Sequence, residues 1–234
     1  IDHTLLRPEA SREDILTVVA EAREAHVKSV CVNPRWVREV HAALEGSDVL
    51  TCTVIGFPLG ASSSAVKAFE TTQAIADGAD EVAMVSDSAA ARAGDRARLE
   101  EDIDAVVQAA HASGPAGAGG ALAKVIVETA LLDDDAIVLA CEAAVAAGAD
   151  FVKTSTGFST GGATVEDVRL MRGIVGDALG VKASGGIRDW DTALAMIAAG
   201  ANRIGASSGV ALLTGAPAAI RRLSPSAAAD DTPW

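Results

Sequence analysis

Two hydrophobic patterns alternate along most of the chain. Short apolar runs rich in β-branched residues occur at 30–32, 52–57, 82–85, 125–127, 151–152, 181–183 and 203–205. Between them the apolar positions follow helical spacing, as at 15–22 and 99–110. Strands that alternate with helices predict βαβ units, and near-continuously apolar strands indicate a parallel sheet that is covered on both faces.

The number of strands favours a closed barrel over an open sheet. Residues 2–6 can supply an eighth strand, and eight strand–helix units in about 230 residues match the usual size of a (β/α)8 barrel. A doubly wound sheet would use fewer strands and a G-x-G-x-x-G fingerprint, which the glycines after residue 55 do not form. We therefore predict an α/β fold, a (β/α)8 TIM barrel of parallel strands. It should form one domain over 1–223, followed by a frayed tail over 224–234.

A repeated turn supports this architecture. The segments 76–82, 146–152 and 198–204 each end an Ala-rich helix at Gly78, Gly148 or Gly200 and then begin a strand. A glycine at this position predicts a left-handed helix cap. Such turns lie at the bottom of a barrel, so the chemistry is expected at the opposite, carboxyl ends of the strands. The Gly/Ala-rich segment 112–123 is predicted to be a flexible connector without chemistry.

Composition and charge exclude several classes of protein. Lys and Arg total 19 against 32 Asp and Glu, a formal charge of −13, and there is no Tyr. So acidic a chain repels phosphate backbones, and its few aromatic residues make base stacking an improbable mode of binding. No apolar run approaches the roughly 20 residues of a membrane helix. Three cysteines in apolar segments indicate reduced core thiols, so we predict a cytoplasmic protein that binds neither nucleic acid nor membrane.

Two of the five lysines fall at predicted strand ends. Lys153 precedes Thr-Ser-Thr-Gly, and Lys182 precedes Ala-Ser-Gly-Gly. A lone lysine is usually a surface residue, but two of them in one barrel mouth indicate chemistry. An ammonium cannot attack a carbonyl, and lowering a lysine pKa from about 10.4 to about 7 requires roughly 4–5 kcal/mol. Desolvation and a neighbouring cation both lower it, so the pair predicts a nucleophilic Schiff-base lysine and a proton-shuttling partner.

Glycines and hydroxyls follow the last two strands. Gly185 and Gly186 come after one of them, and Gly205, Ser207 and Ser208 lie at the end of the other. Loops after strands 7 and 8 are the usual phosphate site of such barrels, so we predict a small phosphorylated substrate. The four histidines are scattered, and we therefore expect no metal and no cofactor. Cys31, at another strand end, is either a reactive thiol or, more commonly for such a residue, a buried core cysteine.

Six strings, in order along the chain, resemble the 2-deoxyribose-5-phosphate aldolase family. They are DHTLLRP at 2–8, VCVNPR at 30–35, TVIGFPLG at 53–60, KVIVET at 124–129, FVKTSTGF at 151–158 and VKASGGIR at 181–188. The resemblance implies a class I aldolase on a (β/α)8 barrel. It would cleave 2-deoxy-D-ribose 5-phosphate reversibly into D-glyceraldehyde 3-phosphate and acetaldehyde. It also implies a homodimer, although no segment identifies an interface.

The resemblance also implies roles for individual residues. Lys153 would form the Schiff base, and Lys182 would lower its pKa and take part in proton transfer. The phosphate would be held by Gly185, Gly186, Gly205, Ser207 and Ser208. The pocket around the sugar would be lined by Asp2, Thr4, Cys31 and Thr156.

One strand departs from the family pattern. Ala83 stands where the family has an aspartate that joins the second lysine in a proton relay. Asp87 lies four residues on, about 13 Å along a strand, which is too far to replace it without a bend. Glu128, at the end of the next strand, either takes over part of the role or is a structural acid.

Three functions therefore remain open. The first is the aldolase itself, turning over slowly because a positioned acid/base is missing. The second is a Schiff-base or transaldolase-like enzyme for other aldehydes, and the third is a barrel that binds a sugar phosphate without catalysis.

Overall fold

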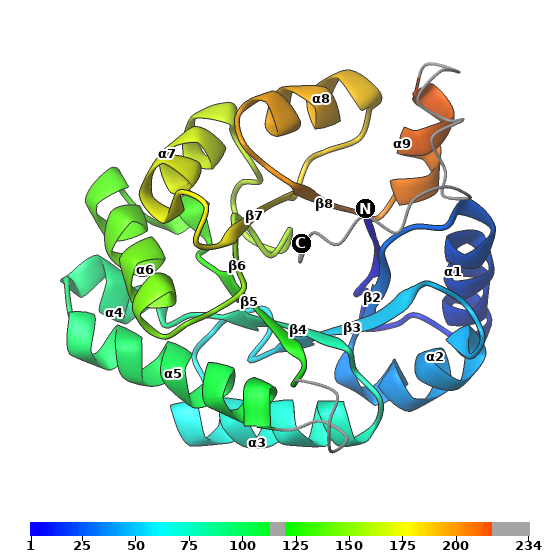
Figure 1. Cartoon of the computed structure of the whole chain (residues 1–234), viewed down its shortest axis with the longest axis horizontal. Helices are drawn as coiled ribbons and strands as arrows, with labels where there is room; N and C mark the ends of the chain where they lie inside the picture. The colour runs from blue at the N-terminus through cyan, green and yellow to red at the C-terminus, as the bar shows by residue number, and fades with distance from the viewer. Residues whose placement is uncertain (113–119, 217–234) are drawn as a thin grey trace.

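The computed structural model describes residues 1–112 and 120–216, which form a closed barrel of eight parallel strands (Figure 1). The strands follow one another around the barrel in sequence order, and β8 closes onto β1. Their bounds are β1 Asp2–Leu5, β2 Ser29–Val32, β3 Leu50–Ile55, β4 Glu81–Val85, β5 Leu122–Ile126, β6 Phe151–Lys153, β7 Gly180–Ser184 and β8 Arg203–Ala206. The predicted α/β fold and (β/α)8 topology are confirmed.

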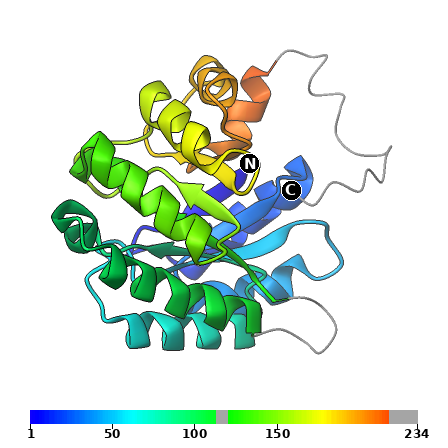
Figure 2. The ribbon, with the colours of Figure 1, turned by 60° about the vertical axis from the view of Figure 1, so that its left-hand side comes forward.

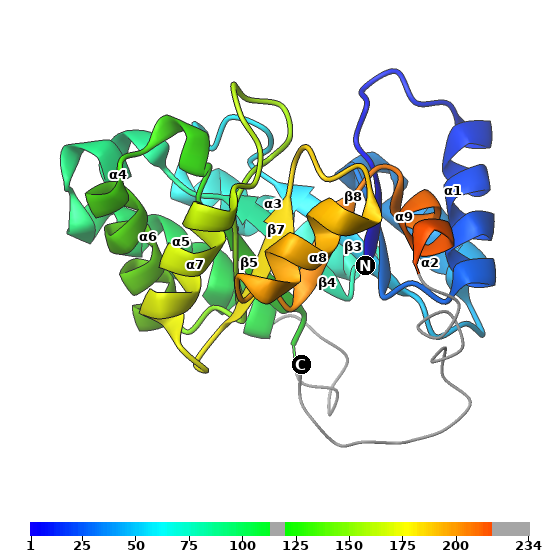
Figure 3. The ribbon, with the colours of Figure 1, turned by 90° about the horizontal axis from the view of Figure 1, so that it is seen from above.

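Helices form a ring outside the strands. They are α1 Arg12–Ala25, α2 Val37–Leu44, α3 Ser64–Ala76, α4 Ser88–Ala93, α5 Arg96–Ala112, α6 Asp134–Ala146, α7 Val165–Val175, α8 Trp190–Ala198 and α9 Gly209–Gly215. Two 3₁₀ turns, Pro34–Trp36 and Thr129–Leu131, precede α2 and α6. Figure 2 shows α5, α6 and α7 lying side by side against the sheet, and Figure 3 shows the barrel from above. Within the described residues, no helix has both the length and the apolarity needed to cross a bilayer.

Side chains near the helix ends explain where several helices begin. Ser11 and Asp14 form a reciprocal capping box at the start of α1, in which each side chain accepts the other residue's backbone N–H. Asp133 caps α6 and Thr164 caps α7 by a single hydrogen bond each, in which the side chain accepts the backbone N–H three residues on. Each such cap stabilises its helix by about 1 kcal/mol, so these side chains determine the residue at which each of these helices begins.

Most predicted boundaries agree with the structure to within a few residues, and one segment differs. Gly78, Gly148 and Gly200 have φ of 109°, 72° and 115°, as a left-handed cap requires. The predicted connector 112–123 is shorter, because α5 extends to Ala112 and β5 begins at Leu122. Its middle, 113–119, lies outside the described residues, as do the end of the predicted domain and the predicted tail 224–234.

The strand register arranges the interior side chains in layers. In a barrel of this kind each layer takes four side chains from alternate strands. From bottom to top, the register gives the layers Ser29, Glu81, Phe151 and Arg203; then Asp2, Cys52, Lys124 and Lys182; then Cys31, Ala83, Lys153 and Gly205; then Thr4, Val54, Ile126 and Ser184. Charged residues therefore occupy the two lower layers, and the third layer holds a single cation.

Candidate active site

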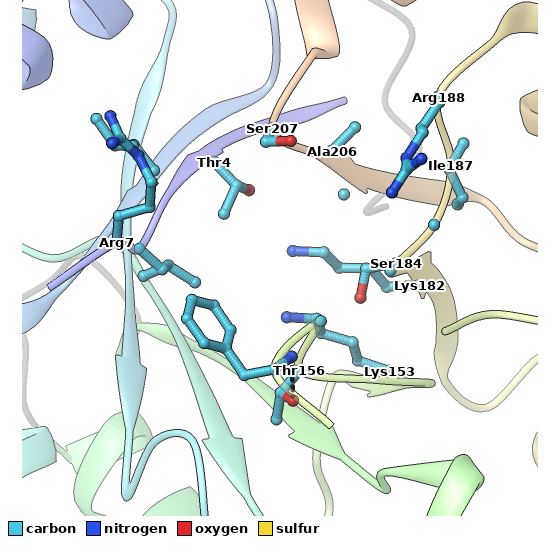
Figure 4. A pocket seen from close by; sticks show the side chains of 17 residues that line it. Thr4, Arg7, Lys153, Thr156, Lys182, Ser184, Ile187, Arg188, Ala206 and Ser207 are labelled. Atoms are coloured by element: carbon cyan, nitrogen blue, oxygen red, sulfur yellow. Dashed lines mark hydrogen bonds between the residues drawn. The ribbon is translucent and has the colours of Figure 1, made fainter. Parts of the chain in front are cut away.

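A cavity of about 440 Å³ opens at the carboxyl ends of β1, β6, β7 and β8 (Figure 4). This is the end of the barrel where the sequence predicts the chemistry. Eight of the predicted site residues line it: Thr4, Lys153, Thr156, Lys182, Gly185, Gly186, Gly205 and Ser207. The fold thus gathers residues that are spread over some 200 positions of the chain into one cavity.

Lys153 and Lys182 reach the cavity from neighbouring strands. They are register partners on β6 and β7, and their side chains are 3% and 1% exposed. Figure 4 shows their nitrogen ends pointing into the same space. The pair that the sequence predicts is therefore formed, in a nearly dry setting.

The two lysines differ in their partners. Lys182 donates to the carboxylate of Asp2, which Arg203 also contacts at 2.8 Å. The side-chain nitrogen of Lys153 makes no hydrogen bond or ion pair with any residue in 1–112 or 120–216. Burial and, after it, the nearby charge of Lys182 together lower the pKa of Lys153 from 10.5 to about 8. Lys153 is thus the cation whose environment favours a neutral amine.

The ion network below this pair includes residues that the sequence reasoning did not identify. Lys124 pairs with Glu81 and lies 3.6 Å from Asp2, and Arg203 lies 3.3 Å from Glu81. Although burial opposes its ionisation, Lys182, Lys124 and Arg203 hold the pKa of Asp2 well below its usual range. The sequence does contain a signal for these residues. They are charged residues at interior-facing strand positions, and a buried charge needs a partner of opposite sign.

Three predicted pocket residues do not line the cavity. Asp2 and Cys31 are fully buried beneath it, and Ser208 is exposed beside it at the start of α9. Asp2 pairs with Lys182 within their shared layer of the barrel. Cys31 lies in the layer of Lys153, with Cys52 as its register partner on β3.

Glu128 is locked onto the loop after β6. It adopts a left-handed backbone conformation with φ of 61°, and its buried carboxylate accepts the backbone N–H and the hydroxyl of Thr156. The Thr156 hydroxyl in turn accepts the N–H of Phe158 at 3.0 Å. These hydrogen bonds make Glu128 a residue that positions the cavity wall. They support the prediction that Glu128 is a structural acid over the alternative that it acts as the missing acid/base.

The rim of the cavity carries two arginines that the sequence reasoning left out. Arg188, on the loop after β7, points its guanidinium into the cavity, and Arg7 lies on the opposite side (Figure 4). Arg7 forms an ion pair with Glu9, with 3.2 Å between the guanidinium and the carboxylate. A Cβ at Gly205 would lie 2.8 Å from Cε of Lys182 and 3.1 Å from Cβ of Ser184, so the close packing there favours glycine. The two arginines provide positive charge at the rim, and Gly205 allows close backbone approach to the cavity.

Ala83 faces the interior and leaves the third layer without an acid. It is fully buried and packs with Cys31, Cys52 and other apolar residues. Asp87 caps α4 and pairs with Arg98 at 2.8 Å, outside the barrel. The expectation that Asp87 is too far away to replace the missing acid agrees with this placement.

One group of side chains has the composition of a metal site. Ligand atoms of Asp2, Cys52 and Glu81 lie within 4.8 Å of one another. The two carboxylates already receive hydrogen bonds from Lys124, Lys182 and Arg203. A metal ion would have to displace buried cations from them, so this donor set fits the internal ion network and does not fit a metal.

Comparisons with known proteins agree with this geometry. Residues 1–215 match the DeoC/LacD family of aldolases. The chain is 72% identical over 213 residues to a deoxyribose-phosphate aldolase of Micrococcus luteus, covering 91% of this chain and 93% of the relative. It is 60% identical over 215 residues to one of Streptococcus gordonii, covering 92% and 94%.

Solved structures give the same result. A putative deoxyribose-phosphate aldolase from Coccidioides immitis superposes with a TM-score of 0.85 at 39% identity, covering 90% of this chain and 81% of that one. A tetrameric deoxyribose phosphate aldolase from Aeropyrum pernix gives a TM-score of 0.83 at 34% identity, covering 91% and 87%.

Proposed function

The chain belongs to the DeoC/LacD family of aldolases, and from this premise we propose that it is a deoxyribose-phosphate aldolase acting through a Schiff base on Lys153. It cleaves 2-deoxy-D-ribose 5-phosphate reversibly into D-glyceraldehyde 3-phosphate and acetaldehyde. The enzyme is a carbon–carbon lyase, and its own side chains supply the chemistry without a cofactor.

The chemistry proceeds from the neutral amine of Lys153. The amine attacks the substrate aldehyde, and loss of water gives a protonated Schiff base. The hydroxyl on the third carbon then loses its proton, the bond between the second and third carbons breaks, and the electron pair flows to the Schiff-base nitrogen. The first product leaves as an aldehyde, the remaining enamine takes a proton at its terminal carbon, and water releases acetaldehyde from Lys153.

The observation that carries this proposal is that no residue in the described part of the chain pairs with the side-chain nitrogen of Lys153. The other buried lysines, Lys67, Lys124 and Lys182, each form an ion pair with a carboxylate. With a pKa of about 8, roughly a tenth of Lys153 is free amine at pH 7. An ordinary lysine would supply less than about a thousandth.

Reduction with borohydride in the presence of 2-deoxyribose 5-phosphate tests the proposal. We expect a mass adduct on Lys153 and loss of turnover, whereas Lys153→Met should form no adduct and show no turnover before or after treatment. An adduct that forms only with other aldehydes would favour an aldolase for a different substrate pair. No adduct at all would favour a barrel that binds a sugar phosphate without catalysis, and would overturn the proposal.

The same proposal assigns the phosphate to the end of the cavity formed by Gly185, Gly186, Gly205 and Ser207. Both glycines after β7 have positive φ, of 88° and 80°, which exposes backbone toward the cavity. Ser208 stands just outside this group, and Arg188 adds a guanidinium to it. We assign the sugar to the side nearer Thr4 and Thr156.

Ala83 motivates a second part of the proposal, which is that the enzyme turns over slowly. A positioned acid/base contributes about 10²–10⁴ in rate, and neither Asp87 nor Glu128 is free to replace it. We expect Ala83→Asp to raise kcat by about 10-fold or more in a steady-state cleavage assay. An unchanged kcat would show that the missing acid does not limit turnover.

Location and assembly remain predictions. We propose a cytoplasmic enzyme, since Cys31, Cys52 and Cys141 are all buried free thiols. The tetramer of the Aeropyrum pernix protein shows that a relative forms higher assemblies. The homodimer expected here can be tested by measuring the mass of the protein in solution.

A further inference from the structure

The third layer of the barrel places a thiol opposite the candidate nucleophile. Cys31 comes from β2 and Lys153 from β6, and strands four apart in an eight-stranded barrel face each other across its axis. The other two members of the layer are Ala83, which contributes a methyl group, and Gly205, which has no side chain and lies beside Cε of Lys182. Ala83, Gly205 and the Lys182 side chain therefore border the space between Sγ of Cys31 and Nζ of Lys153.

Lys153 is a buried polar side chain that is aimed into this space without a partner. It is 3% exposed and lines the cavity, and no described residue accepts a hydrogen bond from it. Cys31 itself is fully buried and does not line the cavity. Bulk water is thus kept away from the thiol, and Lys153 joins the cavity to the layer that Cys31 occupies.

Cys31 lies next to a line of polar contacts that rises from the bottom of the barrel. Glu81 pairs with Lys124, and Lys124 donates to Sγ of Cys52 at 3.5 Å. Cys52 is the register partner of Cys31 on β3, and its own thiol donates to the backbone oxygen of Thr53 at 3.8 Å. The thiol of Cys31 therefore neighbours a cysteine that contacts the ion network.

The groups around Cys31 favour its thiolate. The adjacent Cys52 thiol, Lys182 and Lys153 together lower the pKa of Cys31 to about 6, against opposition from burial and from Asp2. The neighbouring Cys31 thiol and burial raise the pKa of Cys52. Cys31 is thus the thiol of this pair whose surroundings favour the thiolate, and its pKa lies near the pH range in which acid/base catalysis is most efficient.

We propose that Cys31 is the acid/base that exchanges a proton with the carbon adjacent to the Schiff base on Lys153, in the layer where Ala83 supplies no acid. The inference rests on the proposed function. With acetaldehyde bound, the thiolate removes a proton from the methyl carbon, and the C–H electron pair forms the carbon–carbon double bond of the enamine. The iminium nitrogen becomes neutral and Cys31 becomes a thiol. Cleavage uses the reverse transfer, in which the thiol returns its proton to the enamine carbon.

Hydrogen exchange of acetaldehyde isolates this step, because it needs no phosphorylated substrate. Methyl protons are followed by ¹H NMR in D₂O at saturating acetaldehyde, corrected for the rate without enzyme. We expect Cys31→Ala and Cys31→Ser to lower the exchange rate by about 10²-fold or more. Borohydride should still trap acetaldehyde on Lys153 in both variants. Cys141→Ala is the matched control: this thiol is also fully buried, but it lies in α6, away from the barrel interior.

A second substitution separates catalysis from packing. Adding Ala83→Asp to Cys31→Ala should restore exchange, because a carboxylate then occupies the same layer; a packing defect would not be repaired. Exchange within about threefold of the wild type in both Cys31 variants would overturn the assignment while leaving the Schiff base intact. Failure of the wild type to trap acetaldehyde would instead overturn the proposed function.

The wild-type enzyme provides a test that does not depend on the folding of variants. At saturating acetaldehyde the exchange rate reports groups in the Schiff-base complex. We expect a rising limb with a midpoint near pH 6, set by Cys31 among Asp2, Cys52, Lys153 and Lys182. A profile without this limb would overturn the assignment.

Discussion

Replacing Lys182 by Met tests how the barrel produces a neutral amine. The substitution keeps the length of the side chain and removes the cation next to Lys153. It also removes one of three cations around Asp2. Arg203 at 2.8 Å and Lys124 at 3.6 Å remain, so the buried carboxylate keeps partners and we expect the barrel to fold.

The expected size of the effect follows from the pKa of Lys153. The decrease from 10.5 to about 8 corresponds to roughly 3 kcal/mol in favour of the neutral amine. Burial is the larger cause and Lys182 the second, and Asp2 partly neutralises the charge of Lys182. We therefore attribute about 1 pH unit to Lys182, or about tenfold in the fraction of free amine at pH 7.

The measurement is the initial rate of borohydride trapping of acetaldehyde on Lys153, followed by mass spectrometry across pH. Trapping reports formation of the Schiff base, so the loss of later proton transfers by Lys182 does not obscure it. The midpoint should lie near pH 8 in the wild type and about 1 pH unit higher in Lys182→Met. The direction follows because removal of a cation stabilises the ammonium form of Lys153.

An unchanged or lower midpoint in Lys182→Met would refute the reasoning, because the nearby cation would then not destabilise the ammonium. Lys28→Met is the matched control. Lys28 is exposed at the opposite end of the barrel, beside Leu50 and Phe151, and its loss should leave the midpoint of Lys153 where it is.

Three further predictions follow from other residues. Arg188→Leu should raise KM for 2-deoxyribose 5-phosphate by about 10-fold or more and leave KM for unphosphorylated 2-deoxyribose unchanged; equal effects in steady-state assays of the two sugars would remove Arg188 from the phosphate site. Asp102→Asn should reduce the free energy of unfolding in urea by about 3 kcal/mol, since it leaves the fully buried Lys67 without its carboxylate at 2.7 Å, whereas Lys67→Met combined with Asp102→Leu should cost much less. Glu128→Gln weakens its contacts with Thr156, so KM should rise more than kcat falls; a fall confined to kcat would indicate a direct chemical role.

Local patterns in the sequence predicted the order of the elements and the end of the barrel that carries the chemistry. Alternating apolar segments and the left-handed glycines depend on a few neighbouring residues, and these interactions persist in any chain with that pattern. Lys153 and Lys182 could be picked out for the same reason, since each ends a strand and precedes small residues. The missing acid at Ala83 was also visible in the sequence, because the rest of that strand resembles the family pattern and only this position lacks the aspartate.

Tertiary structure alone decided which of the buried lysines has no partner among the residues that the structure describes. Asp2 and Lys182 are 180 positions apart and meet only because β8 closes onto β1 and brings the first and last strands together. The same closure sets Arg203 and Lys124 around that carboxylate. The interaction between two charges depends on their distance and on the dielectric around them, and not on their separation in sequence. The pairing of the interior charges could therefore be read only from the closed barrel. What distinguishes Lys153 is therefore its place in the layers of the barrel, in a layer that contains no carboxylate.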